Sequence, residues 1–227
     1  MFVQPIGGLC NRLRVIISYL LVARSKKEKL VVFWMPHAAC PALFQDLFIV
    51  PTVTDLEIRE PAVGQPNVTS VTCYRHPEAP PESEWISTVM EVLVPLPALQ
   101  VRIDELLAAL GPNFTAVHIR RTDHNSNYDK DADYVTFDAA GSGKVFAATD
   151  NITSMVTLKK GLGDRLIYGG KFAKAGIRMT AVNDALIDLW VSARSSRFKG
   201  TYYSSFSDWI EMMRVGMGSG SAGDLSA

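Results

Sequence analysis

Apolar residues recur with two different periods along this chain, and their alternation predicts parallel sheets covered by helices. Short runs rich in Val, Ile and Phe are typical of buried strands, and segments with apolar residues at helical spacing separate them. In the second half we expect strand 114–119, polar loop 124–142, strand 144–149, helix 152–162, strand 165–168, helix 180–193, strand 197–200 and helix 205–214. Such alternation favours an α/β fold with helices on both faces of a parallel sheet.

The first half begins in the same way and then becomes irregular. A strand at Phe2–Gln4, a helix from Leu13 onward and a strand at Leu30–Trp34 form one strand–helix–strand unit. Between residues 35 and 97, prolines interrupt any long element, and short strands are expected near 55–58 and 71–74. A helix with apolar residues from 99 to 110 stops at Gly111-Pro112, a strong termination signal. We therefore predict an N-terminal domain over 1–105, a C-terminal domain over 106–215 and a flexible tail over 216–227.

Composition and charge exclude several classes of function. Hydrophobic residues make up 48% of the chain and charged residues 20%, as in an ordinary globular protein. Lys+Arg and Asp+Glu both number 23, so no general field attracts nucleic acid or an anionic membrane. Neither a secretory leader nor a membrane-spanning apolar run is visible, and we expect a cytoplasmic protein. The 3 cysteines form no CxxC pair, so we expect reduced thiols and neither a disulfide framework nor a zinc site.

The most suggestive chemistry lies in residues 116–123, Ala-Val-His-Ile-Arg-Arg-Thr-Asp. The predicted strand ends at Ile119 and delivers Arg120 and Arg121 to its carboxyl end, where open parallel sheets bind ligands. Two adjacent guanidiniums suit a shared anion such as a diphosphate. Alternatively, they extend into solvent or pair with Asp123. These residues alone leave both interpretations open.

Other polar residues follow the neighbouring strands and should share the same edge. Ser204 and Ser205 open the last helix, where the first N–H groups can bind phosphate, although Ser205 and Asp208 also have the spacing of a capping box. Asp150 equally fits the N-cap of the helix after 144–149, which the pattern alone favours. His118 is more typical of a half-buried strand-end histidine than of a catalytic one, and Asp188 lies off its helix's apolar stripe, which predicts an exposed charge.

The turn between the first strand and helix, residues 7–12 (Gly-Gly-Leu-Cys-Asn-Arg), is a second candidate. A glycine turn at this place lets backbone N–H groups approach a phosphate or sugar closely, and Gly8 would contribute there. Any tight strand-to-helix turn favours glycine as well, so the motif is not specific.

Three segments together resemble the GDP-fucose-dependent fucosyltransferases, in the branch of α1,6-fucosyltransferases, nodulation fucosyltransferases and protein O-fucosyltransferases. They are residues 7–13, residues 118–123 (HxRRxD, the most specific) and residues 203–207. The resemblance covers the first forty residues and roughly 114–214. It implies a GT-B-like fold, two Rossmann-like domains with parallel sheets facing across a cleft, and it implies a metal-independent transferase without a cofactor.

The same resemblance implies roles for individual residues. Arg120 would hold the donor diphosphate, His118 and Asp188 would contact guanine, and Ser205 would bind a phosphate. Asp150 would shape the site, and Asn11 and Arg12 would face the sugar from the first domain. Gly8, Arg121 and Ser204 complete the expected donor site, while Arg120, Asn11 and the candidate base Asp123 form the expected catalytic set.

The sequence thus predicts a glycosyltransferase, inverting in mechanism, that transfers fucose or a related sugar from a GDP-sugar to a glycan hydroxyl. A departing nucleotide carries negative charge, which Arg120 can meet with charge-assisted hydrogen bonds in the absence of a metal. The expected partners are the nucleotide-sugar donor and a glycan acceptor. Two alternatives stay open: a nucleotide-sugar-binding module without catalysis, motivated by the short acceptor region, and another α/β transferase such as a sulfotransferase.

Overall fold

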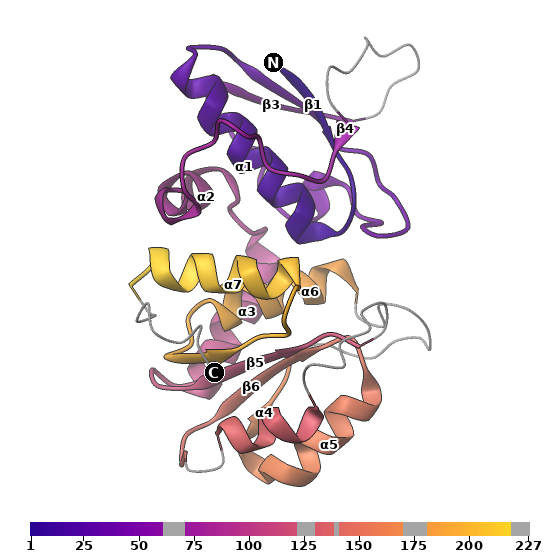
Figure 1. Ribbon diagram of the computed structural model, residues 1–227, viewed down its shortest axis with the longest axis vertical. Helices are drawn as coiled ribbons and strands as arrows, with labels where there is room; N and C mark the ends of the chain where they lie inside the picture. The colour runs from indigo at the N-terminus through magenta and orange to yellow at the C-terminus, as the bar shows by residue number, and fades with distance from the viewer. Residues whose placement is uncertain (61–70, 122–129, 139–140, 170–180, 219–227) are drawn as a thin grey trace. The chain divides into compact units, whose positions relative to one another are not determined.

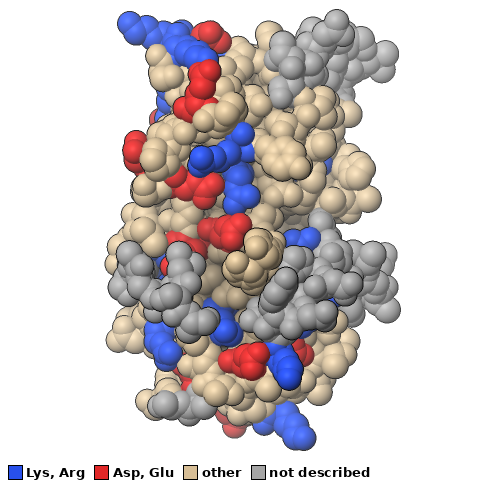
Figure 2. Space-filling view, viewed as in Figure 1, with Lys and Arg blue, Asp and Glu red and all other residues tan. Residues whose placement is uncertain are grey.

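The computed structural model describes residues 1–60, 71–121, 130–138, 141–169 and 181–218. The chain divides into two compact units, Met1–Pro97 and Ala98–Ala227, each with its own parallel sheet. Residues 98–105, which the sequence analysis assigns to the first domain, belong to a helix of the second unit. Acidic and basic side chains are interspersed on the face shown in Figure 2, in keeping with the equal numbers of both signs.

The first unit is a four-stranded parallel sheet with the order β3-β2-β1-β4. Its elements are β1 (Phe2–Pro5), α1 (Leu9–Ser25), β2 (Leu30–Phe33), β3 (Leu56–Arg59), β4 (Val71–Thr72) and α2 (Ile86–Val92), with 3₁₀ turns at Phe44–Asp46 and Glu82–Glu84. Val3 pairs with Val32, and the apolar stripe of α1 that includes Leu13 and Ile17 is fully buried. The strand–helix–strand unit predicted from hydrophobic spacing is confirmed, except that α1 begins at Leu9, so that Asn11 and Arg12 lie in its first turn.

The second unit has a parallel sheet with the order β7-β6-β5-β8. Its elements are α3 (Pro97–Leu110), β5 (Thr115–Ile119), α4 (Asp131–Phe137), β6 (Val145–Thr149), α5 (Ile152–Leu162), a 3₁₀ turn (Gly163–Arg165), β7 (Leu166–Ile167), α6 (Val182–Ser192), β8 (Arg197–Lys199) and α7 (Ser205–Gly216). Within this unit, α4 and α5 cover one face of the sheet, and α3, α6 and α7 cover the other (Figure 1). The predicted strands and helices of this unit are confirmed within a few residues where the structure describes them, and α4 is an additional helix.

Alternating side chains of the central strands build the two cores of this sheet. Val117 and Ile119 of β5 pack with Val145, Tyr134 and Leu158 beneath α4 and α5. The intervening residues of β5 therefore point toward α6 and α7, because successive side chains of a strand alternate between faces. His118 is one of these, and it is thereby delivered to the face that α7 covers.

Part of the loop predicted over 124–142 is helical. Helix α4 spans Asp131–Phe137, and the side chain of Asp133 accepts the backbone N–H of Lys130 at its start. Only Tyr134 of this helix is fully buried, so a seven-residue segment shows no helical apolar period. At the other end of the unit, Gly216 closes α7, and most of the predicted tail, 219–227, lies outside the described residues.

Candidate functional site

The site in the second unit lies along the carboxyl edge of its parallel sheet. Strand β5 pairs with β6 on one side and with β8 on the other, all in parallel. The polar segments that follow these strands therefore start side by side. They are Arg120–Arg121 after β5, Asp150 after β6 and Thr201–Ser205 after β8, and His118 is the last residue but one of β5. This is the edge at which open α/β sheets bind ligands.

His118 is held as a neutral side chain beneath α7. Its Nδ1 lies 2.8 Å from Ser207 Oγ, and its ring stacks on Phe206 with 4.6 Å between centroids. Burial first, and the charge of Arg120 second, lower the pKa of His118 to about 3. The imidazole is therefore uncharged at neutral pH and offers one donor and one acceptor nitrogen. This suits recognition of a neutral ligand group rather than of phosphate.

Gly200 permits this contact, since a Cβ atom there would lie 2.6 Å from Ser207 Oγ. The end of β8 can pass Ser207 so closely only where no side chain intervenes. Gly200 therefore supports His118 indirectly, through Ser207.

Thr201 joins the ends of β5 and β8. Its hydroxyl donates to the carbonyl of His118 at 3.0 Å and accepts the backbone N–H of Arg120 at 3.0 Å. The phenol of Tyr134 lies 3.2 Å from the same oxygen. One almost fully buried hydroxyl thus fixes the backbone on both sides of Ile119 and sets where the Arg120 side chain leaves the strand. Thr201 directly follows the predicted strand 197–200, but no sequence pattern indicates this role.

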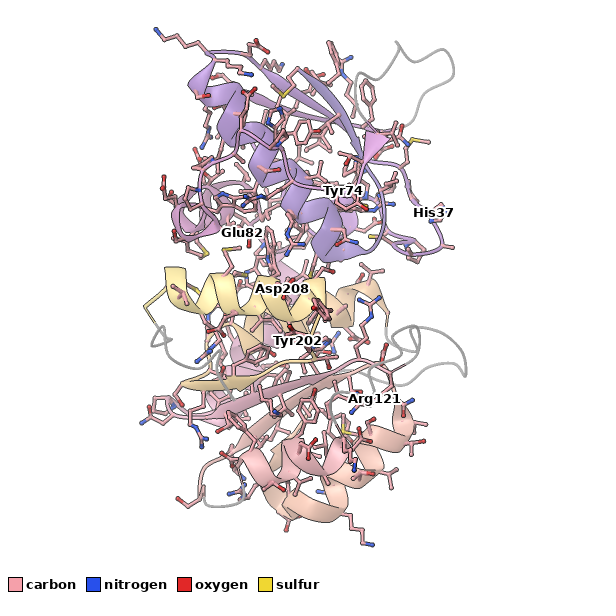
Figure 3. The ribbon with its side chains drawn as sticks, viewed as in Figure 1. His37, Tyr74, Glu82, Arg121, Tyr202 and Asp208 are labelled. Atoms are coloured by element: carbon pink, nitrogen blue, oxygen red, sulfur yellow. The ribbon has the colours of Figure 1, made fainter. Side chains whose placement is uncertain are left out.

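Arg121 turns to the opposite face of the sheet, toward α4. Its Nη2 donates to Asp131 Oδ1 at 2.9 Å, and its guanidinium lies 5.9 Å from the ring centroid of Tyr134. Its backbone N–H donates to Asp150 Oδ1 at 2.9 Å. Arg121, whose place near β5 is labelled in Figure 3, is therefore tied into the scaffold of the site. The side chain of Arg121 therefore has a structural role on the α4 face, which separates it from that of Arg120.

The N-cap assignment for Asp150 is wrong. Helix α5 is capped by Asn151, whose side chain accepts the N–H groups of Thr153 and Ser154 at 2.9 and 3.1 Å. Asp150 holds the segment after β5 instead, which leaves it on the ligand-binding edge. Asn and Asp are about equally good N-cap residues, so a local pattern does not separate two adjacent positions of these types.

The N-cap residue of helix α7 makes no capping hydrogen bond with its side chain. This residue is Ser204 and not Ser205, so the predicted capping box, in which Ser205 is the N-cap, is wrong. The hydroxyl of Ser204 is buried and has no hydrogen-bond partner among the described residues. A buried hydroxyl without such a partner at a helix start favours an anion, because the helix dipole is positive there.

Asp188 is buried in α6, which corrects the exposed position expected from its spacing. It is 5% exposed, and its Oδ1 has no hydrogen-bond partner among the described residues. Burial first, and the charge of Asp184 second, raise the pKa of Asp188 well above its usual value. A Cβ atom at Gly169, which follows β7 on the same edge, would lie 3.1 Å from Asp188 Oδ1. A buried carboxyl oxygen without a partner among the described residues is a rare feature that a ligand N–H would satisfy.

In the first unit, the buried side chain of Arg12 links the two loops that follow β1 and β2 at the carboxyl edge of the sheet. Its Nε donates to the carbonyl of Gly7 at 2.9 Å and its Nη1 to that of Met35 at 2.6 Å, while the guanidinium lies 5.0 Å from the ring centroid of Trp34. The side chain is 1% exposed, and burial lowers its pKa. This geometry makes Arg12 a positioning residue for two loops, and the expectation that it faces the sugar stays a prediction.

Gly8 and Asn11 lie at the start of α1, directly after the turn at Gly7 that Arg12 binds. Gly8 is the N-cap of α1, and Gly7 before it has φ +88°, a left-handed conformation that favours glycine. A Cβ atom at Gly7 would lie 3.1 Å from Asn11 Nδ2, so the turn and Asn11 pack closely. Asn11 is half-buried in the first turn of α1. The predicted base Asp123 lies outside the described residues.

Some remaining expectations concern metals, thiols and membranes. In the described ranges, no group of three or more His, Cys, Asp or Glu side chains could hold a metal ion. Cys10, Cys40 and Cys73 are free thiols. Among the helices that the structure describes, none has both the length and the apolar character needed to cross a bilayer.

The fold is similar to those of solved fucosyltransferases. No protein-family model matches the sequence, and no curated protein matches it significantly. The fucosyltransferase NodZ from Bradyrhizobium is 17% identical, with a TM-score of 0.66 over 92% of each chain. A structure of NodZ α-1,6-fucosyltransferase soaked with GDP-fucose gives 16% identity and a TM-score of 0.67, over 93% of this chain and 92% of that one.

The protein O-fucosyltransferase POFUT1 in complex with GDP-fucose is more distant, at 14% identity and a TM-score of 0.59 over 93% of both chains. Identities this low establish the fold alone. They confirm the α/β, GT-B-like class with two parallel sheets that the three sequence segments implied. This chain has the fold of the GT-B fucosyltransferases.

Proposed function

We propose that this protein is a glycosyltransferase that moves fucose, or a related sugar, from a GDP-sugar to a hydroxyl of a glycan, with inversion at the anomeric carbon. One observation carries the proposal. Arg120, the buried neutral His118, Asp188 Oδ1 and the Ser204 hydroxyl belong to the segments around one sheet edge, and the last two atoms have no hydrogen-bond partner among the described residues. Fold neighbours of similar length are described in complex with GDP and with GDP-fucose.

The diphosphate would bind at Arg120 and the start of α7. Thr201 fixes the backbone N–H of Arg120, and Ser204 and Ser205 begin the helix that follows Thr201 by a short turn. A guanidinium binds phosphate oxygens bidentately, and each charge-assisted hydrogen bond contributes roughly 1.5–3 kcal/mol. The first N–H groups of α7 would add donors that need no reorganisation when charge develops on the leaving group.

The guanine base would bind at His118 and Asp188. Guanine presents N–H donors and the acceptors O6 and N7. An unpartnered buried carboxyl can accept such N–H groups, and a neutral imidazole can supply the complementary hydrogen bond. Because hydrogen bonds from ligand N–H groups favour the ionised carboxylate, binding should lower the raised pKa of Asp188.

Catalysis would require a base for the acceptor hydroxyl and stabilisation of the departing GDP. The acceptor oxygen attacks the anomeric carbon from the side opposite the diphosphate, its proton passes to a base, and the electrons of the C–O bond leave with GDP. Asp123 is our candidate for the base, and Asn11, presented by the turn that Arg12 holds, is our candidate for orienting the sugar. Arg120 would meet the charge on the leaving group without a metal.

A transfer assay tests this proposal. The protein is incubated with labelled GDP-fucose and a panel of glycans, with and without EDTA, and the product is analysed for its anomeric configuration. We expect a fucosylated product of inverted configuration whose rate EDTA does not change. A rate that EDTA abolishes and Mg²⁺ or Mn²⁺ restores would contradict the metal-free mechanism. Donor binding without transfer to any glycan would instead support a nucleotide-sugar-binding module.

A further inference from the structure

Two adjacent tyrosines at the edge of the candidate donor site are unusually exposed. Tyr202 is 56% exposed and Tyr203 is 71% exposed, although they lie between Thr201 and Ser204, which are almost fully buried. Their ring centroids are 4.0 Å apart, with 55° between the ring planes. Two large rings are thus held against each other at the surface instead of filling the core.

The backbone at Tyr203 is in a conformation that bulky residues avoid. Its φ is +55°, in the left-handed region, where glycine and asparagine are common and a large aromatic residue is an outlier. Strained conformations of this kind cluster at ligand-binding sites, where the surrounding structure maintains them. A hydrogen bond with Tyr202 raises the pKa of the Tyr203 phenol, so the two side chains form a pair. The turn therefore presents a paired aromatic surface, although the backbone of Tyr203 must adopt an unfavourable conformation for it.

The position of this pair relates it to the candidate site. Thr201, the preceding residue, binds the backbone of both His118 and Arg120, and Ser204, the following residue, occupies the N-cap position of α7. Tyr202 lies between the carboxyl end of β5 and α7 in Figure 3. The rings thus adjoin the proposed phosphate-binding groups on the solvent side, whereas the groups proposed for guanine, His118 and Asp188, are buried.

We propose that Tyr202 and Tyr203 form a platform on which a sugar ring of the acceptor glycan stacks. The inference rests on the proposed glycosyl transfer. One face of a pyranose is rich in C–H groups and packs on aromatic rings, while the phenol hydroxyls can exchange hydrogen bonds with the sugar hydroxyls. Acceptor glycans arrive from solvent and remain largely hydrated, so they suit exposed rings better than guanine does. The tilt between the rings provides two contact planes for one sugar.

Kinetics of four variants test the platform. Tyr202→Ala and Tyr203→Ala remove one ring each, Tyr203→Gly removes the ring and also relieves the positive φ, and Tyr203→Phe keeps the ring. We expect the acceptor KM to rise at least tenfold in the Ala and Gly variants and less than threefold in Tyr203→Phe. The Kd values for GDP and GDP-fucose, measured by calorimetry, should stay within twofold of the wild type. Val156→Ala, which trims a 62%-exposed apolar side chain of α5, is the matched control.

The possible outcomes distinguish whether the tyrosines contact the acceptor sugar, the donor sugar or the nucleotide. Weaker binding of GDP-fucose with unchanged GDP would mean that the rings hold the donor sugar, weaker binding of both would assign them to the nucleotide, and an unchanged acceptor KM would leave them no role. Each of these results overturns the acceptor platform. Binding of the wild type and the Tyr202→Ala/Tyr203→Ala double variant to a glycan array, with GDP present, needs no turnover. Array binding that the double variant loses supports the platform even if transfer of fucose fails, and equal binding or none by both proteins contradicts it.

Discussion

The backbone N–H of Arg120 donates to the hydroxyl of Thr201 at 3.0 Å, and this contact links the two strands that carry the candidate donor site. The same hydroxyl donates to the carbonyl of His118. Arg120 and His118 are therefore positioned by one buried side chain from the segment that follows β8. We therefore expect the stability of the sheet edge and donor binding to be coupled.

Replacing Thr201 with valine should impair both properties. Valine has nearly the same shape but leaves the N–H of Arg120 and the carbonyl of His118 without their partner, so we expect a loss of roughly 1–3 kcal/mol in the free energy of unfolding. Donor affinity should fall about tenfold, because a displacement of Arg120 weakens a charge-assisted contact. Urea unfolding and calorimetry with GDP measure the two effects. Thr201→Ser keeps the hydroxyl and should restore most of both; a valine variant that matches the wild type would show that the link is dispensable.

The buried His118 predicts a definite dependence of stability on pH. Its pKa is about 3 in the folded protein and about 6.5 when unfolded, so the unfolded state binds the additional proton between these values. The stability that the neutral imidazole of His118 contributes is fully present above pH 6.5, and it is lost as pH falls toward 3. The free energy of unfolding should decrease by up to ~1.4 kcal/mol per pH unit in this window.

Substitution identifies the group responsible for that slope. His118→Asn should flatten it, while His37→Asn, which removes an exposed histidine of the first unit, should leave it as in the wild type. The measurement is urea unfolding at several pH values between 4 and 7. An unchanged slope in His118→Asn would mean that the imidazole is not held neutral by burial.

Replacing Asp188 with asparagine should preserve or raise the free energy of unfolding and should weaken GDP binding. Its folded pKa is raised, so the stability that its protonated form contributes is complete below about pH 3.9 and is lost as pH rises through the folded pKa. Asp188→Asn removes this loss, and we expect a variant at least as stable as the wild type at pH 7.5. GDP affinity should nevertheless fall on the order of tenfold or more, because a carboxylate acceptor for guanine N–H groups is lost.

Calorimetry with GDP and urea unfolding at pH 5 and 7.5 measure both effects of Asp188→Asn. Asp184→Asn is the comparison, since Asp184 is paired with Arg102 at 3.1 Å and lies in the same helix. A less stable Asp188→Asn variant with unaltered GDP affinity would contradict both the ionisation and the binding assignment.

Arg12 should act through the two loops it holds. Arg12→Met keeps the apolar stem but leaves the carbonyls of Gly7 and Met35 without their donor, and we expect a loss on the order of 2–3 kcal/mol in the free energy of unfolding. The variant is compared with Lys27→Ala, an exposed position at the end of α1, by urea unfolding. Equal stability of the two variants would contradict the structural role assigned to Arg12.

Hydrophobic spacing predicted most of the fold because it reports burial directly. The strand that ends at Ile119 and the helix from Ser205 both have strong hydrophobic patterns, and both were placed within a few residues. Helix α4 was missed because it is short and polar, and tertiary contacts hold it: Arg121 binds Asp131 and Tyr134 enters the core.

The positions of some candidate site residues were predicted correctly and the environments of others were not. The reason is that side-chain environments depend on neighbours far away in sequence. The position of Arg120 followed from the strand end alone. The burial of Asp188 did not, since α6 is buried on more faces than its amphipathic stripe suggested, including the positions of Asp184 and Asp188. The roles of Asp150 and Ser204 each differed from expectation by one helix-capping position, which local patterns resolve poorly.

Calorimetric titration with GDP and UDP tests the central claim, that the carboxyl edge of the second unit binds a guanine nucleotide through Arg120. The wild type should bind GDP at least tenfold more tightly than UDP. Arg120→Ala should weaken GDP binding a hundredfold or more, because it removes two or more charge-assisted hydrogen bonds, whereas Arg59→Ala, an exposed arginine of the first unit, should not. Undetectable GDP binding by the wild type, or undiminished binding by Arg120→Ala, would contradict the account.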